Sequence, residues 1–419
     1  MSQMSFLGFG FQRPISLLAV MASVCGTAVL GGACTVNNAP ATPDGGPVTP
    51  GTDGGTDAPG STGPLGFAPS NVSLSGIDLT MAGDSDIATP CDLSTEPGPT
   101  PGATCLTNAV EAIVTQSDGS KVHMFVVKSL KVEPTGHLTV DRPGLPLVIV
   151  SLGDMTILGS IDVHAEGDRG VGGGATATQN GQKGVGPGGG PPATGVGAAT
   201  KGAGAGGGSY CGKGGRGAVE AMAPTQAGEP TASYGTPEIV PLVGGSTGGS
   251  GSFGAGAGGG AVQLVAGGQF SLGAGVYINV GGGGGQPAVS SNFGDNSSGG
   301  GSGGSILIEA KGVQISGILA ANGGGGGGVS ATGTNGTPDA KPAPGGAKTG
   351  DGAGGAGGAG ASIDGATPAS VDPGPVGGGG GGVGRIRINS ASGAAVIAAS
   401  AVLSPPVATA CLTQGKVKQ

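Results

Sequence analysis

Short apolar runs recur along the chain, with Gly or another small residue between them. Three stretches of about 20 residues each hold three such runs, and a weaker fourth stretch follows; they lie near residues 145–166, 260–280, 304–322 and 384–400. Apolar and polar residues alternate within the runs, as in Ile386-Arg387-Ile388. Alternation with a period of two places apolar side chains on one face of a β-strand. The pattern therefore predicts an all-β protein built from short strands.

Three short strands per stretch match one coil of a right-handed parallel β-helix, in which each coil covers the apolar face of its neighbour. Aromatic residues make up only 3% of the chain, which fits a narrow interior filled by stacked Val, Ile and Leu. We expect residues 145–400 to form a solenoid of such coils, interrupted by long glycine-rich insertions. A β-sandwich or jelly roll is the alternative fold.

The residues on either side of these repeats have their own patterns. Residues 69–144 are expected to form an N-terminal β segment. In it, Ala109–Thr115 and Lys121–Val127 are strand-like, and the residues Ser117-Asp118-Gly119-Ser120 between them are typical of a hairpin turn. Residues 401–419 are expected to form a C-terminal tail.

Three glycine tracts separate the repeats, at residues 167–259, 281–303 and 323–383, and the chain holds 101 Gly in 419 residues. Gly does not recur at every third position, so a collagen triple helix is excluded. Gly loses more backbone entropy on folding than any other residue. The tracts are therefore either loose loops or packed, extended polyglycine helices, and we expect loose loops.

The N-terminus has the pattern of an export signal. Arg13 precedes an apolar stretch from Ile15 to Leu30, and the small residues Gly31-Gly32-Ala33 lead to Cys34. The stretch is shorter than the roughly 20 residues that a membrane-spanning helix needs. We expect residues 1–33 to be a signal peptide and Cys34 to carry a lipid anchor in the outer membrane or at the cell surface; plain secretion is the alternative.

Residues 34–68 follow as a tether rich in Pro, Gly, Thr and Asp with almost no large apolar side chains. Such a segment cannot bury enough apolar surface to offset its chain entropy, and it is expected to be flexible. A lipid-bearing Cys34 followed by this spacer would hold a folded body clear of the membrane.

Four further cysteines remain in the expected mature chain, an even number that predicts two disulfides in an exported protein. Cys91 and Cys105 flank a Pro/Gly-rich loop and are expected to pair locally, which leaves Cys211 to pair with Cys411. A zinc site is the alternative, but the sequence has no C-x-x-C motif and its three histidines lie far apart.

The sequence offers little catalytic chemistry, and we predict neither an enzyme nor a cofactor. It has no phosphate-binding G-K-S/T motif and no nucleophile elbow before a helix. A carbohydrate lyase or hydrolase would need acidic residues aligned on one face in a groove. The candidates are Asp154, Asp162, Glu166, Asp168 and Arg169, followed by the isolated pair Glu309 and Lys311. Solvated turns explain them more simply.

The net charge of −8 and the scattered Lys and Arg give no electrostatic footprint for nucleic acid. With Cys34, the tether and the Ile-Leu-Ile-Glu-Ala…Ala-Asn-Gly-Gly-Gly-Gly-Gly-Gly units, the chain resembles glycine-rich, PE-PGRS-like surface lipoproteins of Gram-negative bacteria. The anchor, the tether and the missing active site favour a structural or adhesin-like surface protein that presents Gly-rich loops from the solenoid. Its expected partners are the membrane and surface polysaccharide or other cell-surface components. The alternatives are a carbohydrate-active enzyme and a passive spacer or matrix protein.

Overall fold

The computed structural model describes most of the chain from residue 63 onward. The described residues are 63–96, 105–106, 108–193, 203–219, 227–288, 296–347, 352–369 and 376–419. The chain divides into two units, Met1–Asp57 and Ala58–Gln419, and all described residues belong to the second. The predicted signal peptide, Cys34 and most of the tether thus lie outside the described residues. Within them there is no helix, and hence none that could cross a membrane.

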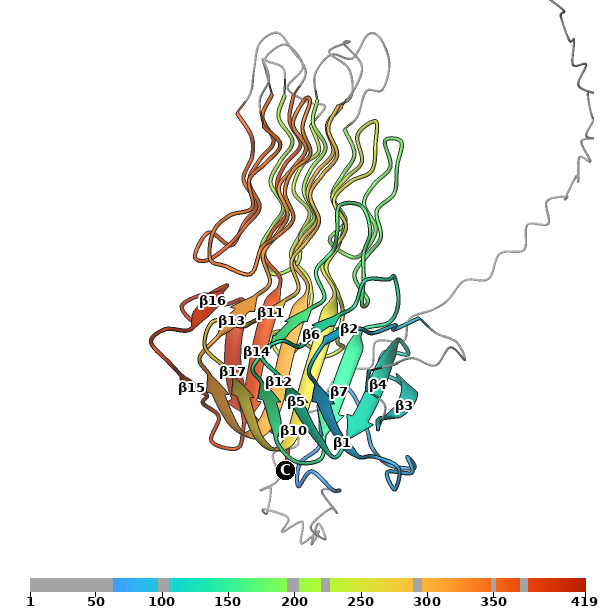
Figure 1. The fold of residues 1–419 in the computed structure, drawn as a ribbon. Coiled ribbons are helices and arrows are strands. Elements are labelled where there is room, and N and C mark those ends of the chain that lie inside the picture. Colours follow the sequence, from blue (N-terminus) through green and yellow to red (C-terminus); the bar gives the residue numbers. More distant parts are fainter. Residues whose placement is uncertain are drawn as a thin grey trace, which may run out of the picture. The chain divides into compact units, whose positions relative to one another are not determined.

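Eleven strands form one large sheet. Its main path runs through β1 (Asp84–Ile87), β5 (Ser129–Val132), β8 (Met155–Ile157), β10 (Ala261–Leu272), β12 (Ser305–Ile315), β14 (Arg385–Ser390) and β17 (Leu412–Lys416). Off this path lie β3 (Val110–Thr115), β4 (Lys121–Val127), β7 (Leu147–Ser151) and β15 (Val396–Ile397). All pairs are parallel except β3 with β4. Figure 1 shows β10, β12 and β14 side by side at the centre.

Six short strands form a second, entirely parallel sheet. Their order is β16 (Val402–Ser404), β13 (Ile318–Ala320), β11 (Tyr277–Asn279), β9 (Ser160–Asp162), β6 (His137–Thr139) and β2 (Pro90–Asp92). Most follow a strand of the large sheet within a few residues along the chain, as β13 follows β12. The chain thus passes back and forth between the two sheets.

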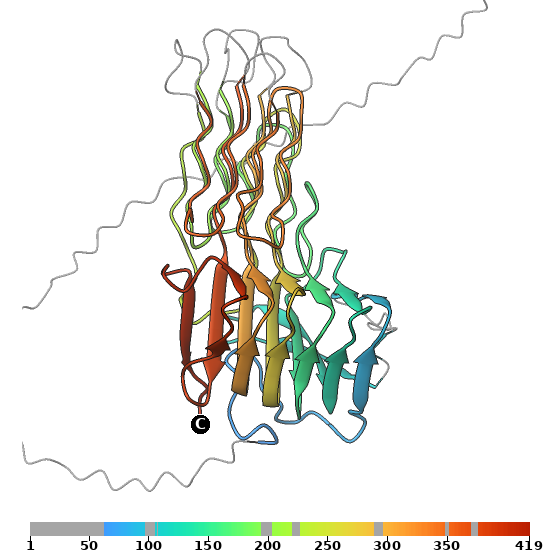
Figure 2. The ribbon, with the colours of Figure 1, turned by 60° about the vertical axis from the view of Figure 1, so that its left-hand side comes forward.

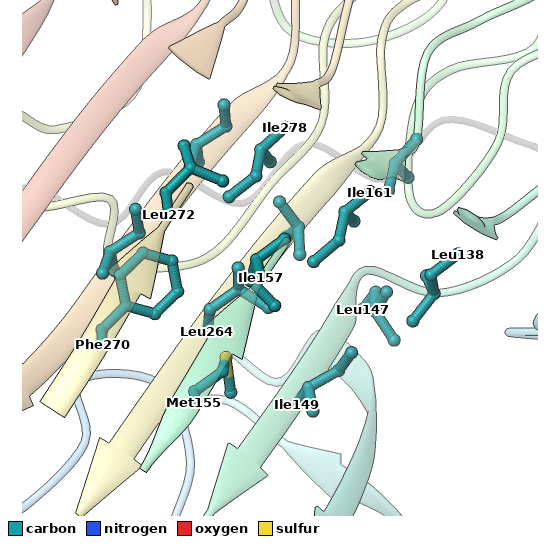
Figure 3. Close-up of a cluster of buried hydrophobic side chains, with 14 of the residues drawn as sticks. Leu138, Leu147, Ile149, Met155, Ile157, Ile161, Leu264, Phe270, Leu272 and Ile278 are labelled. Carbon is teal, nitrogen blue, oxygen red and sulfur yellow. The ribbon is translucent and has the colours of Figure 1, made fainter. Parts of the chain in front are cut away.

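The two sheets enclose one apolar core. Leu138, Ile161 and Ile278 come from the small sheet and Leu264 and Phe270 from the large one, and all five are fully buried. Figure 3 shows these side chains converging between the sheets. Complete burial of one such side chain contributes about 1.5–3 kcal/mol. The apolar set of the alternating pattern therefore holds the sheets together.

A second apolar layer covers the other face of the large sheet. Leu65 and Phe67 precede the first strand, and Leu242 lies between glycine segments; all three pack in one buried cluster with Val148 and Leu307 of the sheet. The large sheet is thus covered on both faces, as parallel sheets generally are. The described fold begins earlier than expected, because Leu65 and Phe67 fall inside the predicted tether.

The predicted β-helix is wrong, because the apolar runs do not turn the corners that a coil requires. In the repeat at 304–322, two runs expected to be separate strands lie in the single strand β12, and only the third run, β13, enters the other sheet. Gly312 lies at a register irregularity between β10 and β12 and not at a corner. The strands form two open parallel sheets and no closed solenoid. An antiparallel sandwich or jelly roll is also excluded by the parallel pairing.

The regions flanking the repeats belong to the same two sheets. The predicted hairpin is confirmed: β3 and β4 pair antiparallel, with Ile113 opposite His123. The C-terminal region 401–419 is more than a tail, since β16 joins the small sheet and β17 is the last strand on the path of the large one. Figure 2 shows these late strands at the edge of the base.

Candidate functional site: a glycine bundle and an acidic pocket

The described glycine segments are ordered and hydrogen-bonded to one another. We call residues 167–259, 281–304 and 323–384, as far as they are described, the glycine bundle. Figures 1 and 2 show its segments running side by side from one end of the sheets. Most of its long glycine runs are fully buried. The expectation of loose loops is therefore wrong for the described residues.

Segment 299–304 shows how the bundle is built. Its six successive backbone N–H groups donate to three neighbouring segments in turn, at N···O distances of 2.8–3.0 Å. Gly299 and Ser302 donate to segment 246–249, Gly300 and Gly303 to segment 379–382, and Gly301 and Gly304 to segment 280–283. A direction that repeats every three residues is the geometry of an extended polyglycine helix. The alternative of packed polyglycine helices is thus the observed one.

The same segment accepts hydrogen bonds from three further segments. The donors are the N–H groups of Gly256 and Gly259, of Gly208, and of Gly324; Arg385, which directly follows the glycines that include segment 379–382, donates to Gly304 as well. Segment 299–304 is therefore surrounded by six others, and each of its N–H groups has a partner although it is buried. Because an unpaired buried N–H is costly, this satisfaction is what lets so many glycines form an ordered body.

Close approach between segments requires glycine at many positions. A Cβ on Gly301 would lie within 3.0 Å of the carbonyl oxygen of Ala257, and one on Gly380 within 3.0 Å of that of Ala356. Real Cβ atoms essentially never come so close, and backbone atoms of a packed neighbour cannot swing aside as a side chain can. Glycine is therefore required at these positions because neighbouring segments pack closely, and not because the chain turns there.

Two disulfides connect the cysteines in the pairing that the sequence predicted. Cys91 in β2 is bonded to Cys105, and Cys211 in the glycine bundle is bonded to Cys411 next to β17. The Cα–Cα distance is 5.7 Å in both. The second bond links the bundle covalently to the sheets.

An aromatic and basic cluster reinforces the same junction. The rings of Tyr210 and Tyr234 stack with centroids 4.4 Å apart, and the Arg385 guanidinium lies 5.9 Å from the Tyr210 centroid. Arg385 also donates two hydrogen bonds, of 3.1 and 3.0 Å, to the carbonyl of Tyr234. Burial raises the pKa of Tyr210 to about 12, so its hydroxyl stays protonated and acts as a donor.

A pocket of about 270 Å³ lies beside the small sheet. We call it the acidic pocket, because four of its lining residues carry carboxylates; its lining is Asp92, Thr139, Val140, Asp141, Asp162, His164, Glu166, Arg169 and Val171. In this pocket the predicted candidates Asp162 and Glu166 lie beside Asp92 and Asp141, which the sequence did not single out.

Register of the small sheet aligns the polar groups of this pocket. Asp92, Thr139 and Asp162 each occupy the last position of a three-residue strand, and the parallel register places them opposite one another; Asn279 continues the row. The Thr139 hydroxyl, between the two carboxylates, donates to Asp92. Neighbouring strands are about 4.8 Å apart, so the backbones carrying Asp92 and Asp162 are separated by roughly 9–10 Å.

Asp162 is held in one orientation by its neighbours. One of its oxygens accepts from the backbone N–H of His164 at 3.2 Å, from Nδ1 of the same residue at 2.6 Å and from the Asn279 amide at 3.3 Å. Burial disfavours the charged imidazole, but the hydrogen bond and charge of Asp162, with the charge of Glu166, outweigh it and raise the pKa of His164 above 6.5.

The structure separates the acidic candidates of the sequence into two groups. Asp162, Glu166 and Arg169 line the pocket, and Arg169 pairs with Glu166 at 2.6 Å. Asp154 instead accepts from the backbone N–H of Gln269 at 2.7 Å, and Asp168 lies beside Gly254. Neither of these two lines the pocket.

Sequence reasoning missed Asp92, Asp141 and His164. A signal for Asp92 was present, because four three-residue segments share an apolar central residue and a polar last residue, and the last residues form the aligned row. The segments are Pro90–Asp92, His137–Thr139, Ser160–Asp162 and Tyr277–Asn279. Glu309 was noted as isolated. It is in fact buried, at 1% exposed, among hydrogen-bond donors.

No group of three or more His, Cys, Asp or Glu side chains in the described part of the chain is placed to hold a metal ion. Comparison with known proteins gave no match: no family model fits the chain, and neither a curated protein nor a solved structure shows significant similarity to it.

Proposed function

We propose that the protein is a non-enzymatic, structural or adhesin-like protein of the cell surface whose working part is the glycine bundle. The supporting observation is segment 299–304, where each successive N–H group bonds to one of three neighbouring segments. Such cross-links in every direction make the bundle stiff, because no segment can bend without breaking bonds to several others. A stiff body that carries few side chains suits a spacer or a support for contacts at the cell surface.

Export and anchoring form part of the proposal. Disulfides persist in oxidising compartments, and the pairs Cys91–Cys105 and Cys211–Cys411 favour an exported protein. The apolar N-terminus, Cys34 and the tether provide a route to a lipid anchor in the outer membrane. A relationship to glycine-rich, PE-PGRS-like surface lipoproteins would be consistent with both export and a lipid anchor.

Hydrogen exchange tests the stiffness of the bundle. We expect the amides of segment 299–304 to exchange as slowly as those of β12, because both need opening of the folded body for exchange. Amides on the exposed edge strand β3 serve as the fast control. Exchange of segment 299–304 at the rate of β3 would contradict a stiff bundle.

Mass and membrane partitioning test the anchor. Native protein beginning at Cys34 with a lipid-sized mass increment is expected in the membrane fraction, and a Cys34→Ser variant is expected in the soluble fraction. An unmodified native chain in the soluble fraction would remove the anchor from the proposal and leave the stiffness argument untouched.

A second candidate is glycoside hydrolysis in the acidic pocket, which the alignment of Asp92 with Asp162 favours. Inverting glycosidases place their two carboxyl groups about 6.5–9.5 Å apart, with a water between one of them and the sugar. A two-strand separation of roughly 9–10 Å between backbones is compatible with that range. Asp162, fixed by His164 and Asn279, would then be the base.

Hydrolysis is tested by incubating the purified protein with a panel of polysaccharides and measuring new reducing ends. Activity lost in both Asp92→Asn and Asp162→Asn, and retained in Asp154→Asn outside the pocket, would establish this candidate. If all variants released reducing ends equally, the activity would come from a contaminant, and glycoside hydrolysis in the acidic pocket would be excluded.

A further inference from the structure

A second pocket, of about 260 Å³, lies on the outer face of the large sheet. Its lining residues are Ser70, Thr236, Glu238, Val240, Arg387, Asn389, Lys416 and Lys418. Arg387 and Asn389 alternate in β14 with the core residues Ile386 and Ile388, and so they lie on the face turned away from the core. We call this site the basic pocket.

The charge of the basic pocket is opposite to that of the chain. Arg387, Lys416 and Lys418 line it together with a single carboxylate, Glu238, although the whole chain has a net charge of −8. None of the three cations forms an ion pair with another residue that the structure describes. Three unpaired cations in one small hollow favour an anionic ligand.

Arg387 is fixed in place by a chain of buried polar contacts. Its Nε donates to Oδ1 of Asn389 at 2.7 Å, and the Asn389 amide donates to the carboxylate of Glu309 at 3.1 Å. Glu309, 1% exposed, also accepts from Gln263 at 2.7 Å and from the Ser70 hydroxyl at 2.6 Å. With Nε held in this way, the two terminal nitrogens of Arg387 remain for a ligand.

Gly415 makes room for this arginine. It is the partner of Asn389 across the β14–β17 pair, and a Cβ on Gly415 would collide with the terminal nitrogen Nη2 of Arg387. The guanidinium therefore lies over the space that a side chain at position 415 would fill. An alanine here would push the guanidinium aside without removing a charge, because the end of an arginine side chain moves easily.

We propose that the basic pocket binds the acidic sugar unit of a carboxylated polysaccharide, such as a uronate. A guanidinium with two free terminal nitrogens matches a carboxylate in a bidentate pair. Glu238 supplies an acceptor for sugar hydroxyls, and it would repel the doubly charged phosphate group. The volume is below the roughly 300–1,000 Å³ of pockets for drug-sized ligands, which fits one sugar unit.

Thr236, Glu238 and Val240 of this site belong to the chain range of the glycine bundle, but no lining residue comes from its segment 299–304 or from the acidic pocket. The basic pocket would let a surface protein bind an anionic polymer specifically. The stiffness of the bundle, in contrast, would support a contact with any partner. Loss of sugar binding would leave the hydrogen-exchange result unchanged, so failure of one proposal can be told from failure of the other.

The test is titration of the purified full chain with trigalacturonate, followed by calorimetry, with neutral galactotriose and inorganic phosphate as comparison probes. We expect binding of trigalacturonate that weakens with salt, at least tenfold weaker binding by Arg387→Gln, and several-fold weaker binding by Gly415→Ala and by the exposed Lys418→Gln. Lys183→Gln, a charge removed outside the pocket, should bind as the unaltered protein does.

Several results would overturn the proposal. They are no binding of trigalacturonate at millimolar concentration, equal binding of galactotriose, binding of phosphate as tight as that of trigalacturonate, or unchanged affinity in all three pocket variants. Unchanged thermal unfolding of Lys418→Gln and Gly415→Ala shows that these variants are folded, so their affinities decide the matter even if Arg387→Gln is unstable.

Discussion

Cys211 in the glycine bundle is bonded to Cys411 beside the last strand of the large sheet, although 200 residues separate them in sequence. The two segments would otherwise be joined only by hydrogen bonds and by packing. Around this bond the backbone N–H groups of Cys211 and Gly212 both donate to the carbonyl of Val383, so the covalent link and the hydrogen-bonded lattice meet at one place.

Removing this disulfide should destabilise the protein more than removing the short one. The chain-entropy model gives about 5 kcal/mol for a loop of 200 residues and about 3 kcal/mol for one of 14. We expect a Cys211→Ser/Cys411→Ser variant to lose more unfolding free energy than a Cys91→Ser/Cys105→Ser variant in guanidinium titrations. Equal losses would contradict the expected dependence of the stabilisation on loop length.

Alanine at Gly301 should disrupt the bundle. The new Cβ would meet the backbone carbonyl of Ala257, and overpacking of this kind typically costs about 1–3 kcal/mol. Gly273→Ala is the control, since its nearest neighbour would be 3.2 Å away and a change below about 1 kcal/mol is expected. The measurement is unfolding free energy in denaturant. A Gly301→Ala variant as stable as the control would refute close packing of these segments.

Removing the buried carboxylate of Glu309 should destabilise the large sheet. Glu309→Ala leaves the amides of Gln263 and Asn389 without an acceptor, and each unpaired buried donor costs about 1–3 kcal/mol. Glu229→Ala, which removes an exposed partner of Arg216, should change stability by less than about 1 kcal/mol. Thermal unfolding of the two variants provides the comparison, and similar melting temperatures would contradict the role assigned to Glu309.

His164 gives the acidic pocket a dependence on pH. Its pKa is raised above 6.5 in the folded protein, so the folded state holds the proton more tightly than the unfolded state. The resulting stabilisation is fully present below pH 6.5 and is lost as the pH rises through the folded pKa. Titration of His164 by NMR should give a midpoint above 6.5 that falls in Asp162→Asn. A native midpoint at or below 6.5 would contradict the hydrogen bond to Asp162.

The strands of this fold were largely visible in the sequence, but their assembly was not. Alternation in Ile386-Arg387-Ile388 marks β14 and its buried face correctly. The same pattern cannot show whether a small residue such as Gly312 turns the chain into another sheet or only shifts the register of one strand. That outcome depends on neighbouring strands, and it decides between a closed coil and two open sheets.

The order of the glycine bundle and the positions of the pockets could not be predicted from the sequence for a related reason. Repeated Gly carries no periodic signal of its own, and whether Gly301 is loose or packed depends on the segments around it. The alignment of Asp92 and Asp162 on either side of Thr139 arises from strand register, although 70 positions separate the two carboxylates in sequence. The basic pocket unites Ser70, Glu238 and Arg387, which only the folded chain brings together.

The arrangement of hydrogen bonds in the bundle has a mechanical consequence. The bonds of segment 299–304 run sideways to its neighbours, while Figure 1 shows the segments extending lengthwise from the sheets. A force pulling along the segments would load these bonds in shear and all at once, instead of opening them one after another. The bond between Cys211 and Cys411 would pass part of that load straight to the β17 edge. In this protein, resistance to tension would thus come from hydrogen bonds between backbone groups and not from side-chain packing.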